Sequence, residues 1–120
     1  GNGGVILSEN HYGRDSLAAA ALVLNRMAQS EEPISEWFET IPQFKMVKDR
    51  LELGDTDPDA LFEIAEKTFS ESEIDRQDGL KFTWDDRWIH LRKSNTEPII
   101  RLYAEAPTMK DARNIIKQIK

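Results

Sequence analysis

The chain has 120 residues, 39% of them apolar, which is enough to bury one hydrophobic core. Its 16 basic and 22 acidic residues leave a net charge of −6, which argues against nucleic acid or an anionic membrane as a partner. It contains no cysteine, which excludes disulfides and thiolate metal sites and fits a protein of the reducing cytoplasm.

The N-terminal residues 1–30 are expected to be the end of a larger domain. A glycine-rich start leads into a predicted buried strand at Val5–Leu7, and a helix over residues 15–29 follows, with Asp15 or Ser16 as its N-cap. This helix is apolar on nearly every side, so it needs packing partners on several faces. Residues 1–30 cannot supply those partners by themselves.

Residues 31–42 are predicted to form a linker or hinge between two domains. Within them, Ser35 can cap a brief helix that carries Trp37 and Phe38 and ends before Pro42. The two aromatic side chains are interpreted as core residues in preference to a binding pair, because aromatic rings gain free energy on burial. The domain boundary is therefore placed in this segment.

From residue 43 to residue 120 the pattern is that of a compact α+β unit. A charged strand over residues 44–53 is expected at a sheet edge, and the pair Asp57-Pro58 begins a helix. Four strands then follow, near Ile74 and over residues 80–84, 87–92 and 99–106. With a last helix, which Thr108 caps, the order strand, helix, four strands, helix predicts an antiparallel sheet with two helices on one face.

Residue alternation in the last two strands separates two faces of the predicted sheet. One face is apolar and is expected to form the core: Ile89, Leu91, Ile100, Leu102 and Ala104. The other face is expected to be functional or solvated: Trp88, His90, Arg92, Arg101 and Tyr103. The apolar face is expected to be covered by two helix stripes, namely Leu61, Ile64, Ala65, Thr68, Phe69 and Met109, Ala112, Ile115, Ile116, Ile119.

The loop between the last two strands is rich in hydrogen-bond donors. Ser94, Asn95 and Thr96 offer two hydroxyls, an amide and several backbone N–H groups, and Arg92 and Arg101 flank them. A phosphate ester has three acceptor oxygens and nearly two negative charges, and a planar guanidinium can bind it through two hydrogen bonds. The loop is therefore interpreted as a phosphate-binding site.

A plain turn between two strands is the alternative interpretation of this loop. Serine, asparagine and proline are also common in tight turns. In addition, Arg92 and Arg101 could pair with Glu97 and Glu105, both of which lie close by in the sequence. Spacing alone leaves both possibilities open.

No catalytic residue and no metal site are expected in this chain. His11 and His90 are isolated from other metal ligands in the sequence. Ser94 follows His90 closely, but no third group is placed to orient the histidine as a base.

Four segments together resemble the α-D-phosphohexomutases, which comprise the phosphoglucomutases, phosphomannomutases and phosphoglucosamine mutases. They are Gly1-Asn2-Gly3-Gly4-Val5-Ile6, His11-Tyr12-Gly13-Arg14-Asp15, Asp78-Gly79-Leu80-Lys81 and Arg92-Lys93-Ser94-Asn95-Thr96-Glu97-Pro98. The resemblance covers essentially the whole chain. It implies that residues 1–30 end the third domain of such an enzyme and that residues 43–120 form its complete, TBP-like fourth domain.

The resemblance also implies a function. In these intramolecular phosphotransferases, a class of isomerases, a phosphoserine gives its phosphoryl group to a hexose phosphate, and the bisphosphorylated sugar turns over and returns the other phosphate. The fourth domain holds the phosphate that is not transferred. By resemblance, Arg92, Ser94, Asn95 and Thr96 hold that phosphate, with Arg101 at the margin of the site.

Other parts of such an enzyme are expected outside this chain. The catalytic serine loop and the Mg²⁺ loop belong to earlier domains, so the chain alone is expected to be inactive and to depend on upstream domains of the same protein. Sugar contacts are assigned by resemblance to Asn2 and Gly3. The choice among glucose, mannose and glucosamine phosphates is left open.

A function of a different class is a non-catalytic protein-interaction module of the same α+β shape. Its binding face would be the sheet face that carries Trp88, His90 and Tyr103. A response of the loop amides to phosphate or to glucose 1-phosphate would favour the enzyme, whereas a response to protein partners alone would favour the module.

Overall fold

The computed structural model describes residues 4–30 and 32–120 of the chain. It divides into two compact units, Gly1–Pro42 and Gln43–Lys120. Each unit has its own secondary structure, so the two are described separately.

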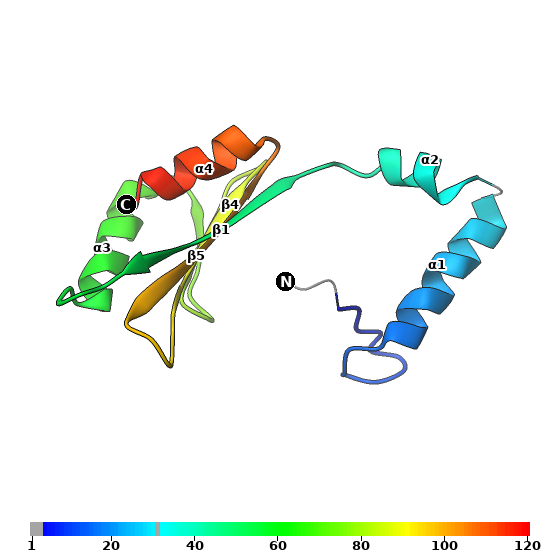
Figure 1. Cartoon of the computed structure of the whole chain (residues 1–120), viewed down its shortest axis with the longest axis horizontal. Coiled ribbons are helices and arrows are strands. Elements are labelled where there is room, and N and C mark those ends of the chain that lie inside the picture. The colour runs from blue at the N-terminus through cyan, green and yellow to red at the C-terminus, as the bar shows by residue number, and fades with distance from the viewer. Residues whose placement is uncertain (1–3, 31) are drawn as a thin grey trace. The chain divides into compact units, whose positions relative to one another are not determined.

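The first unit contains the helices α1 (Ser16–Ser30) and α2 (Ile34–Glu39) (Figure 1). Asp15 caps α1, because its Oδ1 atom accepts hydrogen bonds from the N–H groups of Leu17 and Ala18 at 2.9 and 3.0 Å. The hydrogen bond from Ala18 is the main cause that holds the pKa of Asp15 below its ordinary value. The predicted cap is thus confirmed, and no residue of α1 is buried.

Val5–Leu7 does not form the predicted strand. Its carbonyls accept local hydrogen bonds instead: that of Val5 from the N–H of Asp15 at 2.9 Å, and that of Leu7 from the N–H groups of Asn10 and His11 at 2.9 and 3.0 Å. A strand needs a paired neighbour, and in the described part of this unit no other strand is available for pairing. The apolar run therefore remains a loop.

The prediction that Ser35 caps α2 is also wrong. Pro33 occupies the N-cap position with φ −59° and ψ 143°, and its carbonyl accepts hydrogen bonds from the N–H groups of Glu36 and Trp37 at 3.0 and 3.2 Å. Proline fixes φ at a value compatible with the start of a helix, so the N-cap lies two residues earlier in the chain than the predicted Ser35.

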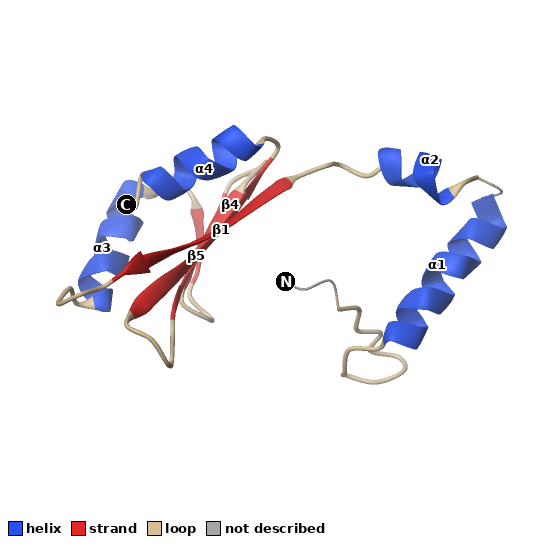
Figure 2. Cartoon of the chain, in the orientation of Figure 1, coloured by secondary structure: helices blue, strands red, loops and turns tan. Residues whose placement is uncertain are grey.

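The second unit is a five-stranded antiparallel sheet with two helices (Figure 2). Its elements are β1 (Lys45–Glu52), α3 (Pro58–Thr68), β2 (Glu73–Asp75), β3 (Leu80–Thr83), β4 (Trp88–Lys93), β5 (Ile99–Ala106) and α4 (Met109–Lys117). The strand order is β1-β5-β4-β3-β2. This confirms the predicted α+β class, the order of elements and the edge position of the first strand.

The helix caps of the second unit agree with the sequence prediction. Asp57 precedes Pro58 and accepts a hydrogen bond from the N–H of Asp59 at 3.0 Å. Thr108 accepts one from the N–H of Asp111 at 3.1 Å. Each cap satisfies a donor that the first turn of a helix leaves without a backbone partner.

The core lies between one sheet face and both helices. The sheet contributes Leu80, Phe82, Ile89, Leu91, Ile100, Leu102, Ala104 and Ala106. The two helices and the residues directly after them contribute Leu61, Ala65, Phe69, Ala112, Ile115, Ile116 and Ile119. Three predicted core residues are exposed instead, namely Ile64, Thr68 and Met109. Successive residues of a helix are rotated by about 100°, so the side chain of Ile64 points away from the sheet whereas that of its neighbour Ala65 is buried. Phe62 packs against the edge of the core and is partly buried.

Candidate functional site

Three arginines form a row across adjacent strands, on the sheet face opposite to the one that α3 and α4 cover. Arg101 of β5 pairs with Arg92 of β4 on one side and with Arg50 of β1 on the other. Directly opposite residues of an antiparallel pair point to the same face, and like charges in such positions are destabilising. Because this arrangement costs stability, it points to an anion that brings the arginines together.

Arg92 and Arg101 each lie beside a carboxylate. Arg92 lies 2.9 Å from Asp78 and Arg101 lies 3.6 Å from Glu97. Both pairs are exposed, so each contributes only about 0.2–1 kcal/mol. The sequence allowed a pairing of Arg101 with Glu97, which is observed, whereas the partner of Arg92 comes from the turn before β3.

The loop after β4 is closed by its own backbone. The N–H of Ser94 donates to the carbonyl of Ile99 at 3.0 Å, and the N–H of Ile99 donates to that of Glu97 at 2.8 Å. The carbonyl of Pro98 accepts from the N–H of Leu53, which follows β1, at 3.0 Å. The loop is therefore anchored at both ends and on the β1 side.

Between these anchors the loop presents donors without partners. The Ser94 Oγ atom is buried and has no hydrogen-bond partner among residues 4–30 and 32–120. In the same ranges, no hydrogen bond uses the N–H groups or side chains of Asn95 and Thr96, which are exposed. A buried hydroxyl without a partner costs stability, so its position suggests a ligand that supplies the missing bond.

These donors and two of the arginines surround one pocket of about 230 Å³. It is lined by Arg92, Lys93, Ser94, Asn95, Thr96 and Arg101. The structure thus brings together all five residues that the sequence assigns to a phosphate site. Hydroxyls, backbone N–H groups and guanidiniums are the donors that phosphate oxygens accept from.

Lys93 lines this pocket, but its ammonium group forms an ion pair with a residue of α3. Its Nζ atom lies 2.6 Å from Oδ1 of Asp59 at the start of α3 and 5.3 Å from the centre of the Phe62 ring. The Lys93 ammonium therefore ties β4 to α3, and the two guanidiniums of Arg92 and Arg101 are the main positive charges facing the loop pocket.

The Asp78-Gly79 turn braces β4 beside Arg92. Gly79 has φ 81°, and a Cβ atom added there would lie 2.2 Å from the carbonyl oxygen of Leu91. The carbonyl oxygen of Asp78 lies 2.6 Å from Nε2 of His90, which is a hydrogen bond whose donor is the imidazole. Only glycine permits this close approach, so the turn fixes where the Asp78 carboxylate meets Arg92.

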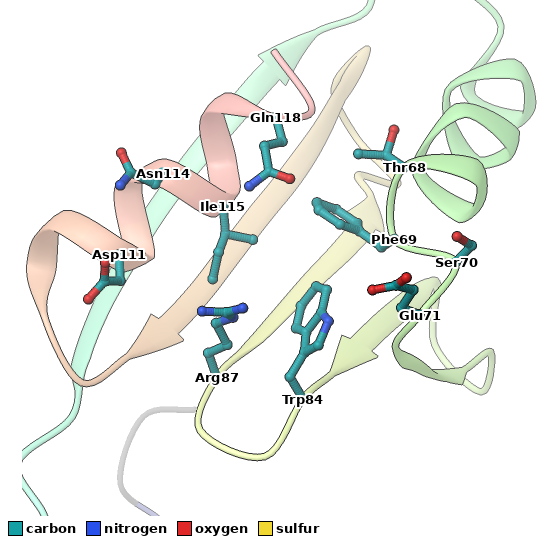
Figure 3. Close-up of a pocket in the computed structure, with 10 residues that line it drawn as sticks. All are labelled: Thr68, Phe69, Ser70, Glu71, Trp84, Arg87, Asp111, Asn114, Ile115 and Gln118. Atoms are coloured by element: carbon teal, nitrogen blue, oxygen red, sulfur yellow. The ribbon is translucent and has the colours of Figure 1, made fainter.

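A larger pocket, of about 470 Å³, lies on the other side of the sheet, between the end of α3, the turn after β3 and α4 (Figure 3). It has two carboxylates, Glu71 and Asp111, for one guanidinium, Arg87. That guanidinium lies 5.6 Å from the centre of the Trp84 ring, and the two side chains stand next to each other (Figure 3). This balance of charge does not suit a phosphate, so the loop pocket is the candidate site.

The aromatic residues of the open sheet face are partly engaged within the fold. The indole N–H of Trp88 donates to Glu105 at 3.1 Å, and the ammonium of Lys81 lies 5.2 Å from the Trp88 ring centre. His90 contacts the Asp78 turn, and Tyr103 is half-buried. These contacts favour a structural role for this part of the face.

The remaining sequence predictions concern sugar and metal sites. Asn2 and Gly3, the predicted sugar contacts, lie outside the described residues. In the described ranges, no three His, Asp or Glu side chains are grouped so that they could hold a metal ion. None of the helices described there combines the length and apolarity needed to cross a bilayer.

Comparison with known proteins decides the family. Residues 45–120 match the phosphoglucomutase/phosphomannomutase family in its C-terminal domain. The chain belongs to this family. A phosphoglucomutase/phosphomannomutase of Thermococcus kodakarensis is 32% identical over 97% of the chain and 26% of its own length. A phosphoglucosamine/phosphogalactosamine mutase of Sulfurisphaera tokodaii is 33% identical over 99% of the chain and 27% of its own length.

A crystal structure of a phosphoglucomutase/phosphomannomutase family protein from Burkholderia thailandensis is also similar. It is 25% identical with a TM-score of 0.67, and the alignment covers 97% of this chain and 25% of that one. The chain therefore spans about a quarter of the length of its relatives in the phosphoglucomutase/phosphomannomutase family. Its five-stranded sheet and two helices are the C-terminal domain of that family.

Proposed function

We propose that this chain is the C-terminal part of a phosphohexomutase and that it holds the phosphate group that is not being transferred. The observation that supports this most directly is the loop pocket. Its five predicted residues meet around one cavity, and the buried Ser94 hydroxyl there has no partner among the described residues. Membership of the phosphoglucomutase/phosphomannomutase family agrees with the proposal.

The proposed reaction moves a phosphoryl group between C1 and C6 of a hexose phosphate. A phosphoserine elsewhere in the full enzyme transfers its phosphoryl group to the free hydroxyl of the sugar, which forms a bisphosphorylated sugar and a free serine. The sugar then turns over and returns its other phosphoryl group to the serine. One phosphate is therefore always a spectator that needs to be held.

The loop pocket can hold a spectator phosphate with complementary charge and donors. Arg92 and Arg101 supply positive charge, and the Ser94 hydroxyl and the N–H groups of Asn95 and Thr96 donate hydrogen bonds to phosphate oxygens. Fixing the unreactive end of the sugar presents its reacting hydroxyl in one orientation. This contribution is positional, as is typical of phosphoryl transfer.

The chemistry itself is assigned to parts of the full enzyme outside this chain. Mg²⁺ would neutralise charge on the transferred phosphoryl group, and the described residues offer no cluster of three ligands for it. Under this proposal the chain alone is inactive, and its partners are the hexose phosphate and the upstream domains. The identity of the sugar depends on contacts made there.

The test is a titration of the whole chain with inorganic phosphate and with glucose 1-phosphate, followed by NMR. The amide signals of Ser94, Asn95 and Thr96 are expected to shift, and Arg92→Ala is expected to remove the shift. Arg87→Ala, which removes the same charge in the pocket on the opposite side of the sheet, serves as the control. Loop amides that do not respond to either ligand, or that respond equally in Arg92→Ala, would contradict the proposal.

A further inference from the structure

A shallow pocket of about 440 Å³ adjoins the loop pocket on the β1 side. It is lined by Lys48, Asp49, Arg50, Glu97, Ile99, Arg101 and Tyr103. Arg101 lines both pockets, so the two open onto the same guanidinium. A ligand bound at the loop therefore lies beside the pocket that contains Arg50.

Arg50 is close enough to Arg101 for both side chains to contact the same anion. The two residues are directly opposite each other in the β1–β5 ladder. Neighbouring strands are about 4.8 Å apart, and an arginine side chain is longer than this spacing. The guanidinium of Arg50 can thus reach an anion that rests on Arg101.

The present partner of Arg50 can be exchanged for such an anion. Its Nε atom lies 3.0 Å from Oε1 of Glu52, which belongs to the same strand, and both side chains are about two-thirds exposed. An exposed pair of this kind contributes little stability, and guanidinium has five N–H donors. Arg50 can turn toward a phosphate at little cost.

We propose that Arg50 is a third guanidinium of the phosphate site and selects for a doubly charged phosphate monoester. This inference rests on the proposed function of the loop pocket. Two arginines and neutral donors suffice to bind a phosphate group with a single negative charge. A third guanidinium at the rim of the pocket adds the most binding free energy when the ligand carries the second negative charge of a monoester. Lys48 lines the same pocket but stands opposite Tyr103, one row away from the arginines.

The test compares two ligands that differ by one charge. Glucose 1-phosphate and its methyl phosphodiester are titrated into the whole chain at about pH 8, above the second phosphate pKa of about 6. In Arg50→Gln, the Kd for the monoester is expected to rise about three- to tenfold, and that for the diester less than about twofold. Arg50→Lys keeps the charge and is expected to restore part of the loss.

Lys48→Gln is the matched control, since it removes one positive charge from the same strand and the same face. It is expected to change the Kd for the monoester less than about twofold. If the unaltered chain binds neither ligand, the proposed function fails together with this inference. If it binds the monoester but Arg50→Gln changes nothing, or Lys48→Gln has the same effect, only the role of Arg50 is overturned.

Discussion

The carboxylate of Asp78 lies 2.9 Å from the guanidinium of Arg92, although the two residues belong to different strand ends. Gly79 lets the turn that carries Asp78 approach the backbone of β4 closely, so the fold fixes the position of this ion pair. In the free protein Asp78 thus occupies a guanidinium that the proposed ligand requires. Phosphate and carboxylate compete for it.

Asp78→Asn is therefore expected to strengthen phosphate binding. Removal of the carboxylate releases Arg92 and takes a negative charge away from the site, so the Kd for inorganic phosphate is expected to fall about two- to fivefold. Calorimetric titration of the whole chain measures this. Asp75→Asn removes a nearby carboxylate that accepts from Gln77 N–H, and it is the control. A Kd that rises in Asp78→Asn would mean that Asp78 positions Arg92 for the ligand.

Gly79→Ala is expected to lower the free energy of unfolding by about 2–4 kcal/mol. The added Cβ would meet the Leu91 carbonyl oxygen at 2.2 Å, and the positive φ of 81° is itself unfavourable for alanine. Gly54 has φ 53° but open space around its Cα, so Gly54→Ala is expected to cost only about 1–2 kcal/mol. Urea unfolding of both variants measures the difference, and equal losses would contradict the close approach.

Ser94→Ala is expected to separate stability from binding. The Ser94 hydroxyl is buried without a partner in the described part of the chain, so its removal is expected to leave the free energy of unfolding unchanged within about 0.5 kcal/mol, or to raise it. Phosphate affinity is nevertheless expected to fall, because the ligand loses a donor. Urea unfolding and phosphate titration of one sample provide the two values. A large loss of stability would show that the hydroxyl has a structural role instead.

The contact between the two ends of the second unit is expected to depend on pH. Lys120 Nζ lies 2.7 Å from Oδ2 of Asp49, and this hydrogen bond is the main cause that lowers the pKa of Asp49 below its ordinary value of 3.8. A lowered pKa in the folded state means that the stabilisation is complete well above pH 3.8 and is lost as the pH falls through the folded-state pKa.

Asp49→Asn is therefore expected to reduce the loss of stability that acidification below about pH 4 produces. Urea unfolding at a series of pH values measures the slope, and added salt is expected to shrink the difference from the unaltered chain because the pair is partly exposed. Asp55→Asn, a change in the loop after β1, is the control. The same slope in Asp49→Asn and in the unaltered chain would show that the ion pair contributes nothing.

Much of the fold of the second unit follows from local sequence patterns. The apolar alternation of Ile89 and Leu91 and of Ile100, Leu102 and Ala104 predicts which sheet face is buried, and Asp57 and Thr108 mark the helix starts. These signals are short-range, because strand alternation and helix caps depend on residues a few positions apart. The chemistry of the loop after β4 is local for the same reason.

Only the tertiary structure shows which charged side chains lie next to each other. Sequence reasoning treated Arg50 as one charge of an exposed strand, and only the register of β1 against β5 places it opposite Arg101. Likewise, Arg92 pairs with Asp78, outside the residues that flank the loop. Strand register and the packing of a turn are set by hydrogen bonds and contacts between segments far apart in the chain, so no local pattern contains them.

In the second unit, the sequence by itself thus determined the order of the elements, the buried face of the sheet and the donors of the loop, since each rests on neighbours in the chain. The tertiary structure determined the guanidinium row, the diversion of Lys93 to Asp59 and the exposure of Ile64 and Met109. It also showed that Val5–Leu7 remains a loop, because a strand forms only where another backbone is present to pair with it.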